Sequence, residues 1–416
     1  MPLILVIVFV VLVATGVGGY FVLTAGDSDS PEDQKPANAM PQLWEAKQPA
    51  SEEDHDLAQD GMRSMWANDN AVIYGDSQGV RAFNRETGKK EWTVKPPKGA
   101  GEVCGMSSTT SDDGVGAVVF DAGGDDCAFL SAVDSDTGRT LWSKNLKGRH
   151  TEREPEVVVN GKTLGAAIGD TYAGFSITGG REQWSVEARG DFCTTSTGLS
   201  SQYLAISSDC SDAKPKQQLS IHDLEYPSIQ SKQAGEKRGI ERTLADEPLT
   251  LLMQEGDGPE PERSIQTFNK DLKPDHSVKL DGDLKDLDFQ PRTTFVDEEE
   301  QVLVTAYRNN TGMAAVDLKN GKLLWKKSEA AAVTMGEDGV VALAGPGAGG
   351  QDPRLLSIDL NTGKERVMGT LYDPQHQFGS PMMLSAEWND NIHTLVVEGR
   401  MLDNQQVIRG YKLPHS

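Results

Sequence analysis

Four cysteines, seven histidines and 63 acidic side chains are the residues of this 416-residue chain with the broadest scope for chemistry. The histidines stand singly, and neither His-Glu-x-x-His nor any other close pair occurs, so the spacing predicts no zinc site. They are His55, His150, His222, His276, His376, His393 and His415. No Cys-x-x-Cys-His sequence is present, which removes the usual attachment site of a c-type haem. We expect these histidines to have surface or packing roles.

Acidic and glycine-rich clusters are the next candidates. Residues 121–126 and 281–288 hold enough carboxylates for calcium, but neither has the Asp-x-Asp-x-Asp-Gly spacing with a distal Glu. Residues 345–350 spell Gly-x-Gly-x-x-Gly, yet a proline and a strand-like run follow where a dinucleotide site needs a helix. We interpret all three clusters as loops between strands. The sequence therefore predicts no catalytic residues, no metal ligands and no cofactor.

The overall charge narrows the range of partners. The chain carries 40 basic and 63 acidic side chains, a net charge of -23. Nucleic acid and anionic lipid headgroups both require a basic surface, and the sequence has no Lys/Arg stripe with interleaved aromatic residues. Nucleic-acid binding is therefore not expected. The acidity indicates a solvated surface, and a cationic partner or peptide is the alternative.

The elements that position these residues are visible as a repeat. Ala-Val-Asp-Ser-Asp-Thr-Gly-Arg-Thr-Leu-Trp at residues 132–142 returns as Ala-Val-Asp-Leu-Lys-Asn-Gly-Lys-Leu-Leu-Trp at residues 315–325. The same pattern recurs at residues 82–92, 174–184 and 357–367. Each copy fits a β-hairpin, because the Asp, Asn or Ser can bond the turn backbone and the Gly can adopt a left-handed conformation.

The spacing of the tryptophans gives the architecture. Those in the repeat frame are Trp44, Trp92, Trp142, Trp184 and Trp325, whereas Trp66 and Trp388 fall outside it. The gap from Trp184 to Trp325 is 141 residues, three times 47, so two units without Trp lie between them, at residues 219–223 and 265–269. Such a period is typical of β-propellers, and about 45 residues per blade gives about eight blades.

The two ends of the repeat region predict how the ring closes. Residues 41–46 resemble an outer Trp strand with no hairpin before it, and the C-terminal residues resemble three strands with no Trp strand after them. Joining these ends would complete the last blade and remove exposed sheet edges. The sequence thus predicts an all-β, eight-bladed β-propeller, closed by an N-terminal strand, over residues 41–416.

The pattern Ala-x-Asp-x-x-Thr-Gly-Lys/Arg-x-x-Trp resembles the pyrroloquinoline quinone (PQQ)-like propeller repeat. That family includes quinone-dependent alcohol dehydrogenases and non-enzymatic relatives such as the propeller lipoprotein of bacterial outer-membrane assembly. The resemblance covers nearly everything after residue 40, and it implies that the Trp of each outer strand docks between neighbouring blades. By this similarity the frame tryptophans Trp44, Trp92, Trp142, Trp184 and Trp325 are inter-blade packing residues.

The resemblance also implies which features an enzyme of this family would need. A funnel at the ring centre would hold the quinone, a calcium-like ion would polarise it, and an aspartate would take the alcohol proton. In the family's enzymes a disulfide between adjacent cysteines lies against the cofactor. No two cysteines are adjacent here, and the family's metal ligands and base match no position of this chain.

The N-terminal residues predict attachment to a membrane. Residues 1–26 contain no charged side chain, and residues 3–23 are dominated by Leu, Ile, Val and Phe. About 20 such residues span a bilayer core, whereas a cleavable signal has a basic start and a shorter apolar run. We predict a single transmembrane helix at residues 1–25, with a removed signal peptide as the alternative. Residues 26–40, rich in Asp, Ser, Pro, Glu and Lys, are predicted to be a flexible acidic stalk.

Cysteine placement predicts the compartment. Cys104 follows one Trp strand and Cys127 precedes the next hairpin, and Cys193 and Cys210 take similar places two blades later. This placement predicts two disulfides, Cys104–Cys127 and Cys193–Cys210, each inside one blade. Disulfides persist in oxidising compartments, so the propeller would lie outside the cytoplasm. Four free buried thiols in a cytosolic propeller are the alternative.

These observations favour a membrane-anchored, extracytoplasmic propeller that acts as a non-catalytic binding or assembly scaffold. Its partner would be a protein of the cell envelope, met through loops at residues 108–116, 211–218 and 256–263. A PQQ-dependent oxidoreductase with an unrecognised site is the alternative. A sensor that reports to another membrane protein through the anchor is a third possibility.

Overall fold

The structure is a computed structural model of the 416-residue chain. It describes residues 36–47, 64–76, 79–123, 127–146, 155–226, 230–256, 261–289, 293–307, 312–328, 330–336, 339–345, 352–372, 378–384, 394–401 and 406–413. The predicted anchor at residues 1–25 and nearly all of the predicted stalk lie outside these ranges. Within them, no helix is long and apolar enough to cross a membrane.

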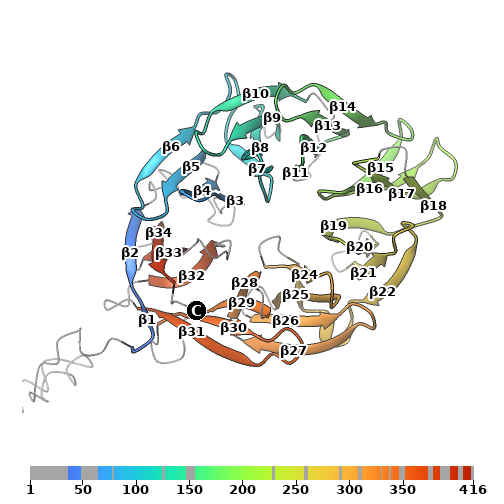
Figure 1. Cartoon of the computed structure of the whole chain (residues 1–416). Coiled ribbons are helices and arrows are strands. Elements are labelled where there is room, and N and C mark those ends of the chain that lie inside the picture. Colours follow the sequence, from blue (N-terminus) through green and yellow to red (C-terminus); the bar gives the residue numbers. More distant parts are fainter. Residues whose placement is uncertain are drawn as a thin grey trace, which may run out of the picture.

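The described residues form eight β-sheets that follow one another around a ring (Figure 1). The predicted all-β, eight-bladed propeller is therefore confirmed. We number the blades in chain order and name the strands of each from the centre outward. A single 3-10 helix, η2 (Gly282–Leu284), interrupts the strands in the described residues.

The first four blades come from consecutive strands. Blade 1 is β3 (Ser64–Ala67), β4 (Ala71–Asp76), β5 (Gly79–Asn84) and β6 (Lys90–Val94). Blade 2 is β7 (Val103–Met106), β8 (Val115–Asp121), β9 (Cys127–Asp134) and β10 (Thr140–Asn145). Blade 3 is β11 (Glu156–Asn160), β12 (Thr163–Ile168), β13 (Thr171–Ser176) and β14 (Glu182–Val186). Blade 4 is β15 (Cys193–Leu199), β16 (Tyr203–Cys210), β17 (Gln217–Asp223) and β18 (Gln230–Ala234).

The remaining blades include the ring closure. Blade 5 is β19 (Gly239–Asp246), β20 (Leu249–Glu255), β21 (Glu262–Phe268) and β22 (Pro274–Lys279). Blade 6 is β23 (Leu287–Asp288) and β24 (Phe295–Asp297), both on β25 (Val302–Tyr307), then β26 (Gly312–Asp317) and β27 (Lys322–Ser328). Blade 7 is β28 (Ala330–Gly336), β29 (Gly339–Ala344), β30 (Arg354–Ile358), β31 (Glu365–Leu371) and β1 (Ala39–Met40). Blade 8 is β32 (Phe378–Leu384), β33 (Thr394–Met401), β34 (Gln406–Lys412) and β2 (Gln42–Lys47).

Strand burial follows position within the blade. All six residues of the second strand β4 are buried, whereas the outer strand β6 has mainly exposed and half-buried residues. The middle strands are covered on both faces by neighbouring blades, so their sequences are short continuous apolar runs. The core is accordingly divided into clusters that lie between blades rather than one central core.

The N-terminal segment closes the ring as the sequence predicted. Strand β2 pairs antiparallel with the C-terminal strand β34, and Trp44 stands opposite Gly410. The Arg409 guanidinium donates to the Glu45 carboxylate at 2.9 Å across the same pair. The sequence did not predict β1, which pairs in parallel with β31 of blade 7. The N-terminal segment therefore pairs with two neighbouring blades, blade 7 through β1 and blade 8 through β2.

The two units without Trp are also present. Strands β17 and β21 are the third strands of blades 4 and 5, at the places expected for the repeat heads. Trp66, outside the repeat frame, lies on the innermost strand β3, where its indole donates to the Ser107 carbonyl at 2.8 Å. Trp388 lies outside the described residues.

The strand connections are divided between two faces of the ring. On one, which we call the turn face, hydrogen bonds link connections of neighbouring blades: Asn160 donates to the Ser201 carbonyl at 2.7 Å, and Ser201 to Asp246 at 2.5 Å. This face carries the first-to-second and third-to-fourth connections of each blade. The opposite face, the loop face, carries the other connections, and there the Ser211 amide donates to the Phe192 carbonyl at 3.0 Å.

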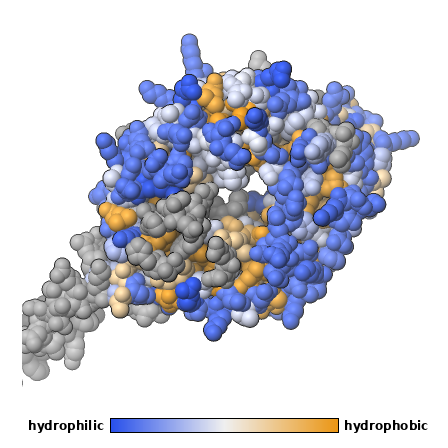
Figure 2. Space-filling view, viewed as in Figure 1, coloured by the Kyte–Doolittle hydropathy of each residue, from blue (hydrophilic) through white to orange (hydrophobic). Residues whose placement is uncertain are grey.

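The faces show that the three predicted contact loops do not form one surface. Residues 108–116 connect β7 to β8 and so lie on the turn face, whereas residues 211–218 and 256–263 connect second to third strands on the loop face. Hydrophilic side chains cover much of the face seen in Figure 2, around an opening near the ring centre.

Candidate functional site

The repeat turn determines which polar side chains of the ring are free to bind a ligand or an ion. In blade 2 the Asp134 carboxylate accepts hydrogen bonds from the Asp136 amide, the Thr137 amide and the Thr137 hydroxyl, at 3.1, 2.9 and 2.8 Å. Gly138 completes the turn at φ +67°. In blade 7 a hydrogen bond from Thr362 lowers the pKa of the corresponding Asp359. These acidic groups are occupied by the turn, in keeping with their interpretation as turn residues rather than ion ligands.

Four tryptophans each attach their own outer strand to the turn of the next blade. Each indole N–H donates to a backbone carbonyl there: Trp44 to Arg85 at 2.5 Å, Trp92 to Asp136 at 3.0 Å, Trp142 to Ile177 at 2.8 Å and Trp325 to Leu360 at 2.7 Å. The turn glycine lies flat against each ring, since a Cβ at Gly88, Gly138, Gly180 or Gly363 would come within 2.5 to 2.8 Å of it. We call such contacts closed junctions.

Trp184 lacks this contact. Its Nε1 atom is buried, and no hydrogen-bond acceptor lies within reach of it in the described structure. The ring nevertheless has the pose of Trp44. A Cβ on Gly410 would lie 2.3 Å from Nε1 of Trp44, and a Cβ on Gly174 would lie 2.1 Å from Nε1 of Trp184. The donor is placed as in a closed junction, but the acceptor is missing.

The sequence of blade 4 explains the missing acceptor. Its turn begins like the others, because the Asp223 carboxylate accepts from the Glu225 and Tyr226 amides at 2.9 and 2.8 Å. The next residue, where the repeat has glycine, is Pro227. The proline ring fixes φ near −65°, so this residue cannot take the left-handed conformation that brings a glycine onto the indole.

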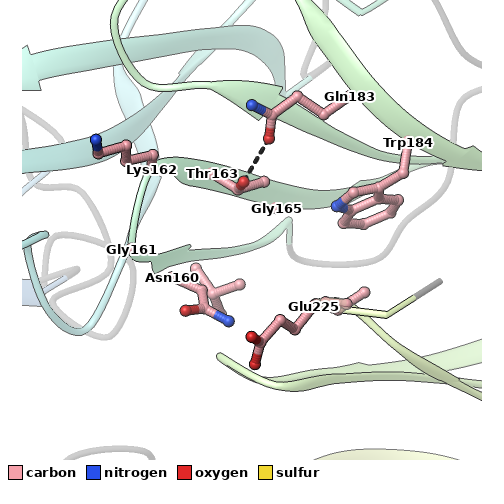
Figure 3. A pocket seen from close by; sticks show the side chains of 10 residues that line it. Asn160, Gly161, Lys162, Thr163, Gly165, Gln183, Trp184 and Glu225 are labelled. Atoms are coloured by element: carbon pink, nitrogen blue, oxygen red, sulfur yellow. Dashed lines mark hydrogen bonds between the residues drawn. The ribbon is translucent and has the colours of Figure 1, made fainter.

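A cavity of about 440 Å³ marks this junction between blades 3 and 4 (Figure 3). It is lined by Val158, Asn160, Gly161, Lys162, Thr163, Gly165, Gln183, Trp184, Leu224 and Glu225. Trp184, Val158 and Leu224 supply the apolar wall, and the other side chains supply polar groups around it. The Thr163 hydroxyl donates to Gln183 at one side. In Figure 3 Asn160 and Glu225 lie together across the space from the strand of Gly165.

Two other junctions lack Trp but are filled by aliphatic side chains. Between blades 5 and 6, Val278 takes the place of the indole, since a Cβ on Gly321 would lie 3.0 Å from it. In the turn of blade 5, Leu272 adopts φ +56° where the repeat has glycine, and its side chain is 4% exposed within the core. Loss of the repeat residues therefore does not by itself open a junction.

The disulfides lie at the other face. Cys104 bonds to Cys127 within blade 2, and Cys193 bonds to Cys210 within blade 4, as predicted. The first cysteine of each pair stands on the innermost strand, β7 or β15. The second cysteines are not equivalent, because Cys127 begins a third strand whereas Cys210 ends a second strand. Each disulfide ties an inner strand to its own blade at the loop face.

The predicted loops and histidines provide no further cluster. Among the described parts of the chain, no group of three or more His, Cys, Asp and Glu side chains could hold a metal ion. Of the Gly-rich residues 345–350, all but residue 345 lie outside the described residues, and the described strands before and after them, β29 and β30, pair antiparallel. Of the histidines, the described residues include His222 and His276; the other five lie outside them.

The described residues do not fit the quinone site that the resemblance implies. Both disulfides join residues far apart in sequence, with separations of 23 and 17. The repeat carboxylates that could serve as ion ligands are bonded to their own turns. On the turn face, burial raises the pKa of Glu298, and the carboxylates of Glu247 and Asp246 raise it further. That group is an acidic surface patch, not a metal cage.

Comparisons with known proteins agree with the fold. Residues 128–209 match the family model described as outer membrane protein assembly factor BamB, a PQQ-like repeat, so the resemblance is confirmed over those residues. The crystal structure of Saccharomyces cerevisiae Sqt1 is similar at 12% identity and a TM-score of 0.52, covering 91% of this chain and 100% of that one. Kuenenia stuttgartiensis hydrazine synthase is similar at 11% identity and a TM-score of 0.46, covering 78% of this chain and 100% of that chain. No curated protein matches the sequence.

Sequence reasoning missed the cavity. The signal was present, since Tyr226 and Pro227 stand where the repeat has Thr and Gly. Only the structure places Trp184 of one blade against the turn of the next.

Proposed function

We propose that this protein is a membrane-anchored, extracytoplasmic β-propeller that binds a protein of the cell envelope and catalyses no reaction. The observation that carries this proposal is that the polar residues of the repeat stabilise the fold and are not left free for catalysis. Asp134, Thr137 and Gly138 are engaged in a turn and in the contact with the preceding Trp. Binding is then left to surfaces that differ between blades, as expected for loops on a rigid scaffold. The match of residues 128–209 to an assembly-factor model supports the same role.

The proposed compartment is supported by the two disulfides. Neither cysteine pair is left reduced in the structure, and bonds of this kind persist in oxidising environments. The uncharged apolar stretch at residues 1–25 would anchor the chain. Together these features support a propeller held at the outer side of a membrane, where its two faces meet other envelope proteins.

Photo-cross-linking in intact cells tests the proposal. A photoreactive amino acid would replace Lys162 on the turn face or Lys216 on the loop face, both of which are exposed. We expect one discrete cross-linked protein from at least one position, found in the membrane fraction. Absence of any specific adduct from both positions would contradict a scaffold role.

A cofactor titration separates this proposal from a PQQ-dependent oxidoreductase. The full-length chain in detergent would be titrated with PQQ and calcium while its melting temperature and the quinone absorbance are followed. We expect neither to change. Saturable binding would raise the free energy of unfolding by about 2.7 kcal/mol at 100 times Kd. Such a rise, together with a shifted quinone spectrum, would overturn the non-catalytic function.

A further inference from the structure

The cavity between blades 3 and 4 has the form of a junction from which one partner is missing. At the closed junction between blades 2 and 3, the Trp142 indole donates to the Ile177 carbonyl at 2.8 Å and the ring is covered by Gly180. At the next junction Trp184 has the same place in the repeat, but neither the carbonyl nor the glycine is supplied. The four closed junctions therefore show what chemistry an occupant of the cavity must present.

We propose that this cavity binds a glycine-containing turn of a partner protein, with a backbone carbonyl of that turn accepting the Trp184 indole N–H. This inference rests on the proposed function and names the chemistry of the contact. The occupant needs glycine where it meets the ring, because at closed junctions even one added carbon would come within 2.5 to 2.8 Å of the indole. It needs a free carbonyl because a buried, unpaired N–H is costly.

The surroundings of Trp184 also suit a peptide. Val158 and Leu224 extend the apolar wall beside the indole, while Lys162 and Glu225, one cation and one anion, stand at the exposed rim. A turn could place its small residues against the wall and its polar side chains at these charges. Tyr226, which follows Glu225, is 54% exposed and adds an aromatic surface next to the cavity. Exposed aromatic side chains at the edge of a pocket are common anchors in protein interfaces.

The location of the cavity is consistent with a docking surface. It opens at the turn face, where the exposed Lys162 and Glu225 belong to two different blades. The disulfide of blade 4 lies at the opposite face, so it holds β15 in place without filling the junction. The described lining residues of the cavity thus lie on the turn-face side of blades 3 and 4, away from the disulfide.

A peptide from the protein itself is a suitable probe. The segment at residues 132–141 carries the turn that covers Trp92 and contains no Trp of its own. The full-length protein in detergent would be labelled with 5-fluorotryptophan, and the Trp184 and Trp142 signals assigned with Trp184→Phe and Trp142→Phe. Far-UV circular dichroism and the melting temperature would show that these variants fold.

The expected result is a saturable shift of the Trp184 fluorine signal as the peptide is added, with the Trp142 signal unmoved. A matched peptide carrying Gly138→Val should bind at least about tenfold more weakly, since its side chain would collide with the ring. No shift at millimolar peptide, or equal shifts with both peptides, would overturn the proposal. A shift that depends on protein concentration alone would assign the cavity to a second copy and would also overturn it.

A turn graft provides the second test. Replacing residues 224–229 with the five residues 135–139 of blade 2 restores the repeat length and glycine to the turn that faces Trp184. We expect the grafted protein to fill the cavity from within, to shift the Trp184 signal without peptide and to lose the peptide response. A graft that folds and still binds the peptide would contradict the inference.

The cross-linking test of the proposed function gives an independent outcome. If envelope protein capture at Lys162 persists in the turn graft, the scaffold function stands and the cavity is not its contact. If capture is lost in the graft while Lys216 adducts are unchanged, both proposals are supported. If no position captures a protein but the peptide still binds, the cavity is real and the scaffold function is not.

Discussion

The junction between blades 2 and 3 and the junction between blades 3 and 4 use the same donor with opposite results. Trp142 is bonded to the next blade and covered by a glycine, whereas Trp184 faces a cavity of about 440 Å³. Both rings stand on outer strands, of six and five residues, and both pack against hydrophobic clusters. The difference therefore comes from the next blade's turn and not from the tryptophan.

The comparison shows how a repeat protein can acquire a binding site. A tryptophan that serves the architecture at four junctions becomes available at a fifth, where its internal partner is replaced. Pro227 stands where the turn glycine should be, and a donor already placed by the fold is left unpaired. Because function depends on sites rather than folds, the exception to the repeat is more informative than the repeat.

Substituting glycine should have the largest effect, and it should differ between the two kinds of junction. Gly138→Ala forces an alanine to φ +67° and puts a Cβ 2.5 Å from the Trp92 ring. We expect it to lower the free energy of unfolding by roughly 4 kcal/mol, the sum of backbone strain and overpacking. Gly161 at the rim of the cavity has φ +53° and open space where a Cβ would stand. Gly161→Ala should therefore lower the free energy of unfolding by only about 1 kcal/mol, through backbone strain alone. Denaturant unfolding measures both. Equal losses would show that the glycine is not needed to meet the ring.

Removing each disulfide tests whether blade 4, at the open junction, depends more on its disulfide for stability than blade 2 does. Replacement of Cys104 and Cys127 by Ser, or of Cys193 and Cys210, opens loops with separations of 23 and 17 residues. Each pair should contribute about 3 kcal/mol on the chain-entropy model. We expect similar falls in melting temperature for the two variants. A much larger fall without Cys193–Cys210 would mean that blade 4 needs this bond to compensate for its open side.

Exchange of indole for phenyl isolates the hydrogen bond. Trp142→Phe leaves the Ile177 carbonyl without its donor, whereas Trp184→Phe removes a donor that has no acceptor. Both variants lose similar apolar area, so Trp142→Phe should be more destabilising by about 1 to 2 kcal/mol. Chemical unfolding of the two variants in parallel gives the difference. A larger loss for Trp184→Phe would reveal a contact at the open junction that the structure does not show.

Acid should weaken blade 4 slightly through His222. Burial, with a smaller contribution from the positive charge of Lys232, lowers the pKa of His222 below its ordinary value of 6.5. Between the lowered folded pKa and 6.5 the unfolded chain binds a proton that the folded chain does not, so stability falls as the pH drops below 6.5. His222→Gln should therefore reduce the fall in melting temperature between pH 7.5 and 5. His276→Gln in blade 5 is the matched control, and an equal change there would contradict a specific role of His222.

The number of blades could be predicted from the sequence because turn glycine and outer Trp recur for a physical reason. At four junctions a left-handed glycine lies against an indole, so the two residues return together at spacings of one blade or a multiple of one blade, and the period is visible. The closing pair of β2 and β34 followed from the same count. Strand β1 could not be predicted, since two residues carry too little pattern to indicate a partner in blade 7.

The candidate site could not be predicted in the same way. Trp184 and Leu224 are brought together by the ring, and no local pattern reports an acceptor that is missing. The three long loops were grouped by length alone, and the structure divides them between two faces. Their strand connections would have separated them, because residues 108–116 follow a first strand and the others follow second strands.

The short strand β1 gives the ring a mechanical property. Tension applied through the chain before residue 36 reaches β1 first, where two residues, Ala39 and Met40, are held to blade 7. The closing strand β2, with a longer ladder to β34, carries the force only after β1 detaches. A pull on this segment would thus be absorbed in two stages, and the weaker attachment would yield while the ring stayed closed.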